Sequence, residues 1–359
     1  MKNMKSKRRR LKMDKIRFAV IGVGGIGQHH IKGIIDNANA ELTALCDNNS
    51  EILDSVCESY GIEKRYADYH GLLNKDIIDA VCIATPDQIH REMVVDFLNA
   101  GINVLCEKPL ALNSDDCRKM LDAESKSSAK LMVGQVCRKT PGFIKAKEIV
   151  DSKMIGELLF VESEYAHDYS EMPLHWRNDK NNPRHPVTGG GCHAVDLLRW
   201  IAGNPIDAYA LSNKKALSDE WPCDDSAITV LRFPDNVMGK VFVSTGCKRD
   251  YTMRTVIYGT KGTIITDNTN SAMSLYLEEF EGKRELFGAK MKEIALRIPV
   301  VINNHNVSAE VNDFVDVLLG KKELDIPGAE GAATVAVCEA IIKSAQSGKA
   351  EKIDYISLD

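Results

Sequence analysis

Two ionisable side chains lie where this sequence pattern would place reacting groups. Lys108 lies in Glu107-Lys108-Pro109, directly after the apolar run VLC, and the carboxyl edge of a parallel sheet is where ligands bind. A lysine ammonium there can hydrogen-bond a hydroxyl and stabilise negative charge on its oxygen. His193 lies in a glycine-rich string that opens a helical pattern, and an imidazole can exchange the hydroxyl proton near neutral pH. Together they predict proton and charge chemistry at a hydroxyl or keto group.

A glycine-rich turn near the start predicts a dinucleotide site. The apolar run IRFAVIG leads into a turn made of Gly22, Val23, Gly24, Gly25, Ile26 and Gly27. A helical pattern follows at once. These glycines allow a tight turn, a close approach to a pyrophosphate and close packing of helix on strand. The helix N-terminus adds N–H groups and partial positive charge.

Asp47 ends the second apolar run, twenty residues past Gly27. A carboxylate there accepts hydrogen bonds from ribose hydroxyls and repels a 2′-phosphate, so NAD is expected ahead of NADP. The alternative for Asp47, a helix N-cap, is compatible with that role.

Two longer strings complete a recognisable set, ATPDQIHREMVVDFLNAGINVLCEKPLAL (84–112) and GGGCHAVDLLRWIAG (189–203). With the opening GVGGIG they resemble the glucose–fructose oxidoreductase, inositol dehydrogenase and MocA family. The similarity runs from about residue 15 to the C-terminus and includes YGTKGTI and HNVSAEVNDFVDVLLG. The resemblance implies an NAD(P)-dependent dehydrogenase or reductase acting on CH–OH groups of a sugar, cyclitol or sugar derivative. It also implies that Lys108 polarises the oxygen and His193 acts as acid and base.

The resemblance implies further contacts with the cofactor. It places the backbone after the run AVCIAT along the ribose and nicotinamide, and Gln135 on the nicotinamide side. The expected cofactor contacts outside the glycine turn and Asp47 are Thr85, Pro86, His90, Glu107, Lys108 and Gln135. A plain first-turn helix residue is an equally good interpretation of His90.

One position departs from the family pattern. Many of its dehydrogenases carry an aspartate four residues before the histidine, where this chain has Gly189. Either another carboxylate serves, or the proton relay works without one. The departure keeps open an alternative reaction, in which tightly bound NAD oxidises a glycoside transiently and elimination breaks the glycosidic bond. A non-catalytic NAD-binding regulator is the second alternative.

The segment YAHDYSEMPLHWRNDKNNPRHPVTGGG (165–191) is rich in His, Arg and Asp. Sugars require dense donors and acceptors and an aromatic face. We therefore expect substrate contacts from Arg138, Tyr165, His167, Trp176, Arg177, His185 and His193. Arg138 lies where the family shows an arginine or aromatic residue, and a surface cation is its alternative. Three histidines, His167, His175 and His185, raise a metal site, but their spacing matches no tetrahedral pattern, so no metal is predicted.

The elements that must position these residues form two domains. From Ile16 to about Val133, short apolar runs alternate with helical patterns, which predicts a doubly wound parallel sheet of Rossmann type. After about Phe143, alternating strands and turn signals predict an α+β domain with a large, mostly antiparallel sheet. We expect a leader at 1–14, an NAD-binding domain at 15–138 and a domain for substrate and oligomer contacts at 139–359. The closing helices, about 305–319 and 328–346, could pack back on the first domain.

Composition bounds the remaining function classes. The 359 residues are 44% hydrophobic and 27% charged with a net charge of −5, so no attraction to nucleic acid or anionic membrane is expected. The basic start MKNMKSKRRRLK is interpreted as a disordered leader, with a nucleic-acid arm as the alternative. Ten cysteines without a C-x-x-C pair favour buried thiols in a reducing cytoplasm. A homodimer or homotetramer through the C-terminal sheet is expected.

Overall fold

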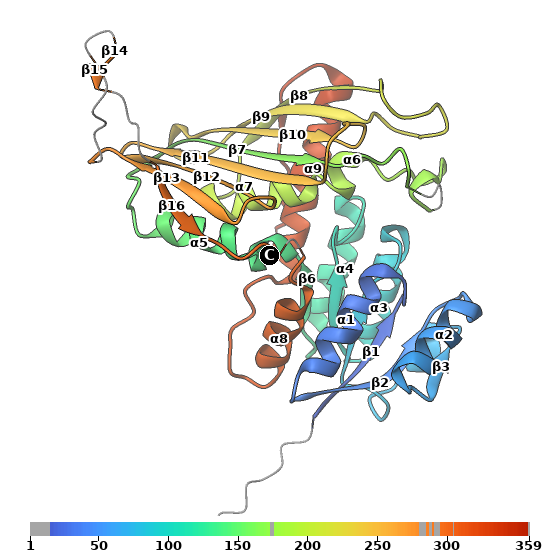
Figure 1. Cartoon of the computed structure of the whole chain (residues 1–359). Coiled ribbons are helices and arrows are strands. Elements are labelled where there is room, and N and C mark those ends of the chain that lie inside the picture. Colours follow the sequence, from blue (N-terminus) through green and yellow to red (C-terminus); the bar gives the residue numbers. More distant parts are fainter. Residues whose placement is uncertain are drawn as a thin grey trace, which may run out of the picture.

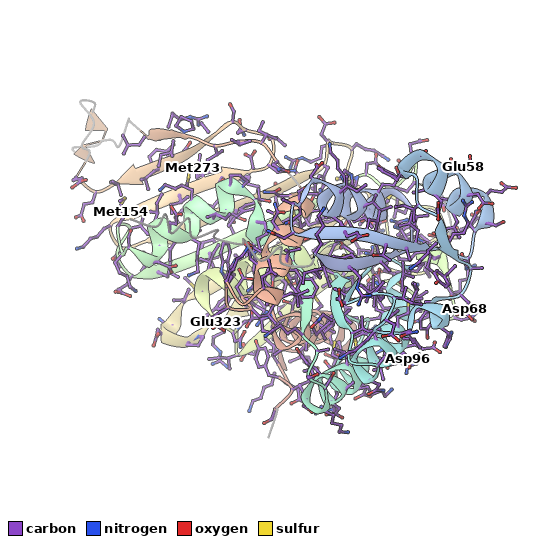
Figure 2. All side chains as sticks on the ribbon, turned by 90° about the horizontal axis from the view of Figure 1, so that it is seen from below. Glu58, Asp68, Asp96, Met154, Met273 and Glu323 are labelled. Carbon is purple, nitrogen blue, oxygen red and sulfur yellow. The ribbon has the colours of Figure 1, made fainter. Side chains whose placement is uncertain are left out.

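The computed structural model describes residues 15–172, 176–279, 285–286, 289–290, 295–303 and 305–357. The basic leader predicted at 1–14 lies outside the described residues. Two sheets, each with its own helices and its own buried apolar cluster, make up the described chain (Figure 1). Figure 2 shows them end to end, with Glu58, Asp68 and Asp96 near one extremity and Met154 and Met273 near the other.

The first sheet is six-stranded and parallel throughout. Its order is β3-β2-β1-β4-β5-β6. The strands are β1 (Ile16–Ile21), β2 (Ala40–Cys46), β3 (Lys64–Tyr66), β4 (Ala80–Ile83), β5 (Asn103–Glu107) and β6 (Leu131–Gly134). β4 and β6 are buried along their whole length, as expected for parallel strands covered on both faces. Strand order reverses between β1 and β4, which creates the crevice where such sheets bind ligands.

Four helices flank this sheet: α1 (Gly25–Asp36), α2 (Ser50–Tyr60), α3 (His90–Asn99) and α4 (Ser114–Lys126). Asparagine side chains start two of them, because Asn49 accepts from Ile52 N and Asn113 accepts from Asp116 N. These bonds satisfy backbone donors that a helix start leaves free. Short 3₁₀ turns lie at η1 (Tyr69–Leu72), η2 (Asp87–Ile89) and η3 (Val136–Lys139).

The second sheet has nine strands in the order β16-β13-β12-β11-β7-β10-β9-β8-β17. Only the pair β7–β10 is parallel. The strands are β7 (Leu158–Ala166), β8 (Asp207–Asn213), β9 (Ser226–Arg232), β10 (Met238–Ser244), β11 (Thr252–Gly259), β12 (Gly262–Asp267), β13 (Ala272–Leu277), β16 (Leu296–Pro299) and β17 (Glu351–Lys352). A separate short pair joins β14 (Glu285–Leu286) to β15 (Ala289–Lys290). The fold class predicted from the sequence is confirmed.

Helices cover one face of the second sheet: α5 (Pro141–Asp151), α7 (Cys192–Ala202) and α9 (Gly328–Ser347) (Figure 1). A short helix α6 (Pro186–Gly189) precedes α7, and a 3₁₀ turn η4 (Trp176–Asn178) lies in the loop before it. The large hydrophobic side chains exposed along the sheet include Tyr209, Leu211, Ile228, Val230 and Met238. Cross-strand register places Tyr209 opposite Val230 and Leu211 opposite Ile228, so these four share one face.

The last helices contact both units. α8 (Val307–Leu318) packs on α1, and the ring centroids of Phe314 and Phe18 are 6.3 Å apart. The Cβ of a residue at Gly33 would lie 3.1 Å from Val311, so α1 and α8 are in close contact. α9 contacts α4 and β6 on one side and α7 and β8 on the other. The closing segment therefore ties the two sheets together.

All ten cysteines lie in the described part and are free thiols. Within the described ranges no helix is long and apolar enough to cross a membrane.

Candidate active site

The glycine turn forms a tight junction between β1 and α1. Gly22 has φ +83°, and a Cβ there would lie 2.6 Å from the carbonyl oxygen of Ala84. A Cβ on Gly27 would overlap the carbonyl oxygen of Gly22. Both positions therefore require glycine, one for its conformation and one for the approach of helix to strand. At Gly24 and Gly25 a Cβ would meet no described atom within 4 Å, so this side of the turn is open.

The start of α1 fits a pyrophosphate. Gly24 is its N-cap, no described side chain caps it, and its first turn holds no acidic residue. The first N–H groups of a helix have no intrahelical partner and carry partial positive charge. They are therefore free to bind an anion.

Asp47 faces the glycine turn from the end of β2. Its Oδ2 accepts from Val23 N at 2.9 Å and its Oδ1 accepts from Asn49 N at 2.9 Å. The N-cap of α2 is Asn49, so the N-cap alternative for Asp47 is wrong. Each carboxylate oxygen keeps acceptor capacity beyond these backbone bonds, as a ribose contact would need.

Lys108 lies at the carboxyl end of β5, before a cis peptide bond to Pro109. Its Nζ donates to the carbonyl oxygen of Gly189 at 3.4 Å, which links the first sheet to α6. The preceding Glu107 is buried and bonded to His30 Nε2 at 2.8 Å. Burial opposes its charge, but the bond to His30 and the nearby cations lower the pKa of Glu107. Glu107 therefore anchors the strand end as a buried carboxylate.

His193 is the second residue of α7 and is almost completely buried. Its Nδ1 lies 3.4 Å from Cys137 Sγ, and its ring lies 6.3 Å from that of Tyr165. Burial, then the positive charge of Lys108, lowers the pKa of His193 well below its usual value. His193 is consequently a neutral imidazole. Lys108 Nζ donates to Gly189 O, and His193 N donates to the carbonyl oxygen of the next residue, Gly190, at 3.2 Å, so both residues contact the same short backbone segment.

Arg184 occupies the space in front of Gly189. A Cβ on Gly189 would lie 2.7 Å from the Cζ of Arg184, and Arg184 Nη2 donates to Gly189 O at 3.0 Å. The Arg184 Nε pairs with Asp87 Oδ2, and both side chains are buried. The side chain of an aspartate at position 189 would therefore compete with this guanidinium for the same space. Asp87, at the start of η2, was not predicted as a site residue, and no local motif marks it.

A cluster of aromatic and histidine rings lies beside His193. Tyr165 OH contacts Tyr169 OH at 2.8 Å and His167 Nδ1 at 3.2 Å. Tyr251 packs at a tilt against His167, with ring centroids 4.9 Å apart, and stacks on His305 with centroids 5.6 Å apart. Tyr165 and His167 were predicted, whereas Tyr169, Tyr251 and His305 were missed. The β7–β11 pairing that brings Tyr251 here joins segments more than eighty residues apart.

Trp176 and Arg177 lie in η4, close to the first sheet's η2. Gln88 Nε2 donates to Trp176 O at 3.0 Å and to Asn182 O at 3.3 Å. The Cζ of Arg177 lies 4.3 Å from the Trp176 ring centroid, and that of Arg184 lies 5.1 Å from it. The loop predicted to bind substrate is therefore hydrogen-bonded to η2, the turn that follows β4.

Gln135 follows β6 and is 1% exposed. Neither its Oε1 nor its Nε2 has a partner among the described residues. Buried amides are normally hydrogen-bonded, so this side chain fits a ligand contact. Thr85 and Pro86 follow β4, and Pro86 is the N-cap of η2.

His90 bridges two backbone carbonyls, with Nδ1 3.0 Å from Pro109 O and Nε2 3.1 Å from Thr85 O. It is fully buried. The ring therefore holds the β4 and β5 loops together from behind, and any cofactor contact here would come from those loops.

The structure changes the interpretation of Arg138. Its Nε and Nη2 donate to Asp196 at 2.8 and 2.7 Å, and Nη2 also pairs with Glu330 at 2.7 Å. The surface-cation alternative is therefore wrong, and these carboxylates take up the side chain's donors in place of the expected substrate. Arg138 joins η3 to α7 and α9 as a buried ion pair.

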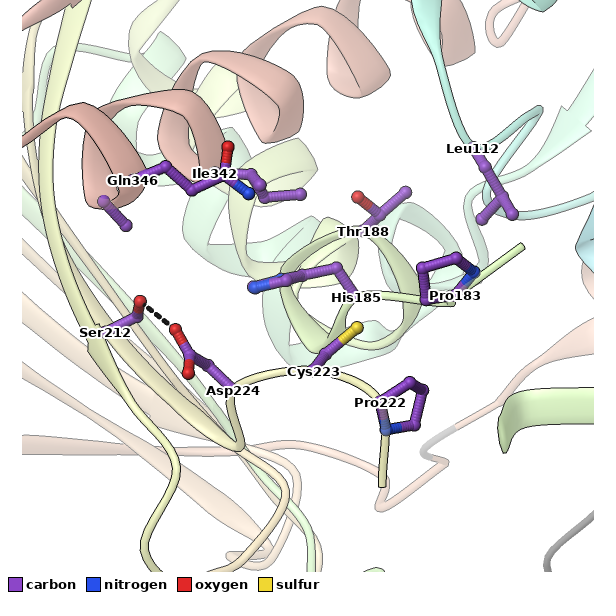
Figure 3. A pocket seen from close by; sticks show the side chains of 11 residues that line it. Leu112, Pro183, His185, Thr188, Ser212, Pro222, Cys223, Asp224, Ile342 and Gln346 are labelled. Carbon is purple, nitrogen blue, oxygen red and sulfur yellow. Dashed lines mark hydrogen bonds between the residues drawn. The ribbon is translucent and has the colours of Figure 1, made fainter. Parts of the chain in front are cut away.

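The structure gives His185 a role that the sequence did not predict. Its Nδ1 accepts from Val187 N at 3.2 Å and so caps α6. Its ring lines a separate cavity of about 410 Å³, together with Leu112, Ser212, Asp224, Ile342 and Gln346 (Figure 3). Neither Lys108 nor His193 lines that cavity. Burial lowers the pKa of His185 to about 4, which keeps it neutral as a cap.

A metal was not expected from the three histidines. His175 lies outside the described residues. Among those that are described, no three His, Cys, Asp or Glu side chains gather in a way that could hold a metal ion.

Comparisons with known proteins place this geometry in a family. Residues 16–135 match a model described as an oxidoreductase family with an NAD-binding Rossmann fold. Residues 143–265 match the GFO/IDH/MocA C-terminal domain. The chain belongs to the GFO/IDH/MocA oxidoreductase family. It is therefore an oxidoreductase, and NAD is its cofactor.

The relatives are similar along much of the chain. Inositol 2-dehydrogenase of Rhizobium meliloti (strain 1021) is 26% identical over 341 residues, 92% of this chain and 96% of the relative. Myo-inositol 2-dehydrogenase of Thermotoga maritima is 29% identical over 274 residues, 74% and 79% of the two chains.

Solved structures share the fold. Levoglucosan dehydrogenase in complex with NADH has a TM-score of 0.86 at 21% identity, over 96% of this chain and 100% of that one. The WlbA dehydrogenase from Bordetella pertussis, in complex with NADH and UDP-GlcNAcA, has a TM-score of 0.79 at 23% identity, again over 96% and 100%.

Proposed function

We propose that this oxidoreductase interconverts a hydroxyl and a keto group on a sugar, cyclitol or sugar derivative. The observation that supports the proposal is that Lys108, at the carboxyl end of β5, and His193, at the start of α7, both hydrogen-bond the backbone at Gly189 and Gly190. The names of the inositol dehydrogenase relatives support the substrate class. The dense hydroxyl and imidazole groups of the cluster around Tyr165 suit a polyhydroxylated ligand.

In this proposal the first domain holds NAD. The N–H groups at the start of α1 bind the pyrophosphate, and Asp47 accepts from ribose hydroxyls. Gln135, whose amide atoms are buried without a described partner, hydrogen-bonds the nicotinamide amide. The backbone at Thr85 and Pro86 lines the ribose. When bound, NAD supplies the acceptor or donor of the hydride.

Lys108 and His193 divide the remaining work. The ammonium of Lys108 donates to the substrate oxygen and stabilises negative charge on it as the hydroxyl is deprotonated. His193, held neutral by its surroundings, takes up the hydroxyl proton in oxidation and returns it in reduction. Burial excludes water from the ring and leaves its orientation to Cys137 and Tyr165.

Redox-assisted glycoside cleavage is a second candidate, favoured by Gly189 and the arginine that fills its space. Such a reaction leaves no net NADH. If the enzyme oxidised a simple polyol and released a stoichiometric amount of NADH, this candidate would be rejected.

We also propose an oligomer and a compartment. The exposed apolar side chains of β8, β9 and β10 form a face suited to burial against a second copy, as a dimer or tetramer. The ten free thiols fit a reducing cytoplasm.

The test of the main proposal measures nicotinamide absorbance with a panel of polyols and sugars plus NAD, and of keto sugars plus NADH. We expect turnover with at least one member, and Lys108→Met and His193→Asn each to reduce kcat/KM by at least about a hundredfold. His193→Asn should keep its NAD affinity, because His193 is not among the expected cofactor contacts. No turnover across the panel by an enzyme that binds NAD would reject the proposed reaction.

A further inference from the structure

Three cationic side chains meet at this site, and one described carboxylate forms an ion pair with them. Lys108, Arg177 and Arg184 converge from the first sheet, η4 and the segment before α6. The carboxylate paired with them is Asp87, which binds Arg184. Glu107, which directly precedes Lys108, is bonded to His30 and also accepts from the backbone N of Lys108 at 3.2 Å. Two of the three cations therefore lack an anionic partner among the described residues.

Arg177 is the least compensated of the three. No described carboxylate lies within ion-pair distance of it, and its guanidinium stacks on Trp176 beside that of Arg184. Burial, followed by the charge of Arg184, lowers the pKa of Arg177. A partly buried cation without a partner is unfavourable. Stacking occupies the face of the guanidinium and leaves its in-plane N–H donors for a ligand.

The absence of an acid at Gly189 increases the imbalance. An aspartate there would lie beside Arg184 and near Lys108, which donates to Gly189 O. Glycine removes that charge and admits the guanidinium instead. The same positive charges act on the neighbouring rings. Burial and then Lys108 lower the pKa of His193, and burial, Arg177 and Lys108 lower that of His167.

We propose that the substrate is an anionic polyol, a sugar acid whose carboxylate pairs with Arg177 while its reacting hydroxyl lies between Lys108 and His193. A guanidinium binds a carboxylate through two parallel N–H···O bonds. A neutral polyol would leave Arg177 unpaired. This inference rests on the proposed reaction, because it names the substrate class of that site.

Matched pairs of substrates test the inference. The pairs are D-glucuronate with D-glucose, D-galacturonate with D-galactose and D-gluconate with sorbitol, each with saturating NAD. We expect the acid of at least one pair to exceed its neutral partner in kcat/KM by about a hundredfold. An active enzyme that uses the neutral members as well as the acids, or better, would overturn it.

Arg177→Gln then separates recognition from folding. We expect the KM for the preferred acid to rise by about a hundredfold with kcat less affected, and the KM for the neutral partner to rise by a much smaller factor. Arg177→Lys should recover part of the loss by keeping the charge. Arg297→Gln, which removes an exposed arginine on β16, is the control and should change neither. An equal loss for acid and neutral substrates in Arg177→Gln would contradict the assignment.

Binding measurements distinguish failure of this inference from failure of the proposed reaction. Calorimetric titration of the NADH-loaded enzyme with D-glucuronate, D-glucose and a hexose phosphate does not depend on turnover. We expect only the carboxylate to bind well, to weaken with salt and to lose affinity in Arg177→Gln. This result without turnover would reject the proposed reaction and keep the anion site. No binding of any acid in the panel, or preference for the phosphate, would overturn the inference.

Discussion

The Nδ1 atom of His193 lies 3.4 Å from the Sγ of Cys137. Burial raises the pKa of the Cys137 thiol, so the partner of the imidazole is a neutral thiol and not a carboxylate. A thiol is a weak hydrogen-bond partner and adds no negative charge to hold a proton on the ring. Burial and Lys108 then lower the pKa of His193 without opposition from a nearby acid.

This arrangement predicts the pH dependence of hydroxyl oxidation. The neutral ring is the base, and it exists above the pKa of His193, so lowering that pKa extends the active range toward acid. We expect kcat/KM to fall on the acid side only below about pH 6.5, the ordinary histidine pKa. The measurement is a pH profile with saturating NAD, with fluorescence as a check that the fold persists. A limb at or above that pH that disappears in His193→Asn would contradict it.

Asp47 should decide cofactor choice. Replacing it with serine removes both the ribose acceptor and the charge that repels a 2′-phosphate. We expect the Kd for NAD to rise about tenfold, which is about 1.4 kcal/mol, and the Kd for NADP to fall. Isothermal titration measures both, and Asp36→Asn, at the far end of α1, serves as control. Unchanged discrimination would remove Asp47 from the cofactor site.

Gly24→Ala and Gly27→Ala should have different effects on stability and on NAD affinity. At Gly27 the new methyl group overlaps the Gly22 carbonyl oxygen, so we expect lower stability together with lost NAD affinity. At Gly24 the methyl group meets no described atom within 4 Å, so the fold should keep its stability while NAD affinity falls. Thermal unfolding without cofactor and NAD titration distinguish the two. Full NAD affinity in Gly24→Ala would mean that no pyrophosphate approaches this turn closely.

Arg138 should contribute to stability and not to substrate binding. Arg138→Met leaves Asp196 buried without its main partner, and breaking such a pair costs about 3–5 kcal/mol. Arg65→Met removes an exposed pair with Asp54 and should lower the free energy of unfolding far less, because solvent screens such pairs. Urea unfolding measures both. A drop in substrate affinity of Arg138→Met without loss of stability would restore the original expectation.

The exposed sheet face should be an interface. Val230 and Leu211 are each 57% exposed, and a charge there would oppose burial against another copy. We expect Val230→Asp to lower the mass of the particle measured by light scattering and leave the far-ultraviolet circular dichroism unchanged. A wild-type chain that is monomeric at micromolar concentration would refute the interface.

Local patterns predicted most strands of the two large sheets but not β3, β8, β16 and β17. The apolar runs correspond to β1, β2, β4, β5 and β6, because parallel strands buried on both faces must be apolar throughout. The turns at 234–236 and 259–262 join antiparallel strands as predicted. The glycine string was interpretable for the same reason, since each role depends on neighbours close in sequence.

Contacts between distant segments were beyond such patterns. Arg138 meets Asp196 and Glu330 across 58 and 192 residues, and nothing around QVCRKT indicates these partners. Arg184 reaches Asp87 across 97 residues. His185 looked like one more polar residue of the substrate loop, but its backbone position at the start of α6 makes it a cap. Which polar residue faces a ligand depends on where the two sheets meet.

The packing of α8 on α1 limits how this chain can be divided. Phe314 and Val311 cover Phe18 and the glycine at position 33, although more than 270 residues separate these segments. A fragment that ends near residue 138 would lack α8. The apolar side chains that α8 covers would then face water, and the fragment would be less soluble. A chimera that exchanges the substrate-facing sheet with a relative's must accordingly keep residues 307–318 from the same parent as the Rossmann half.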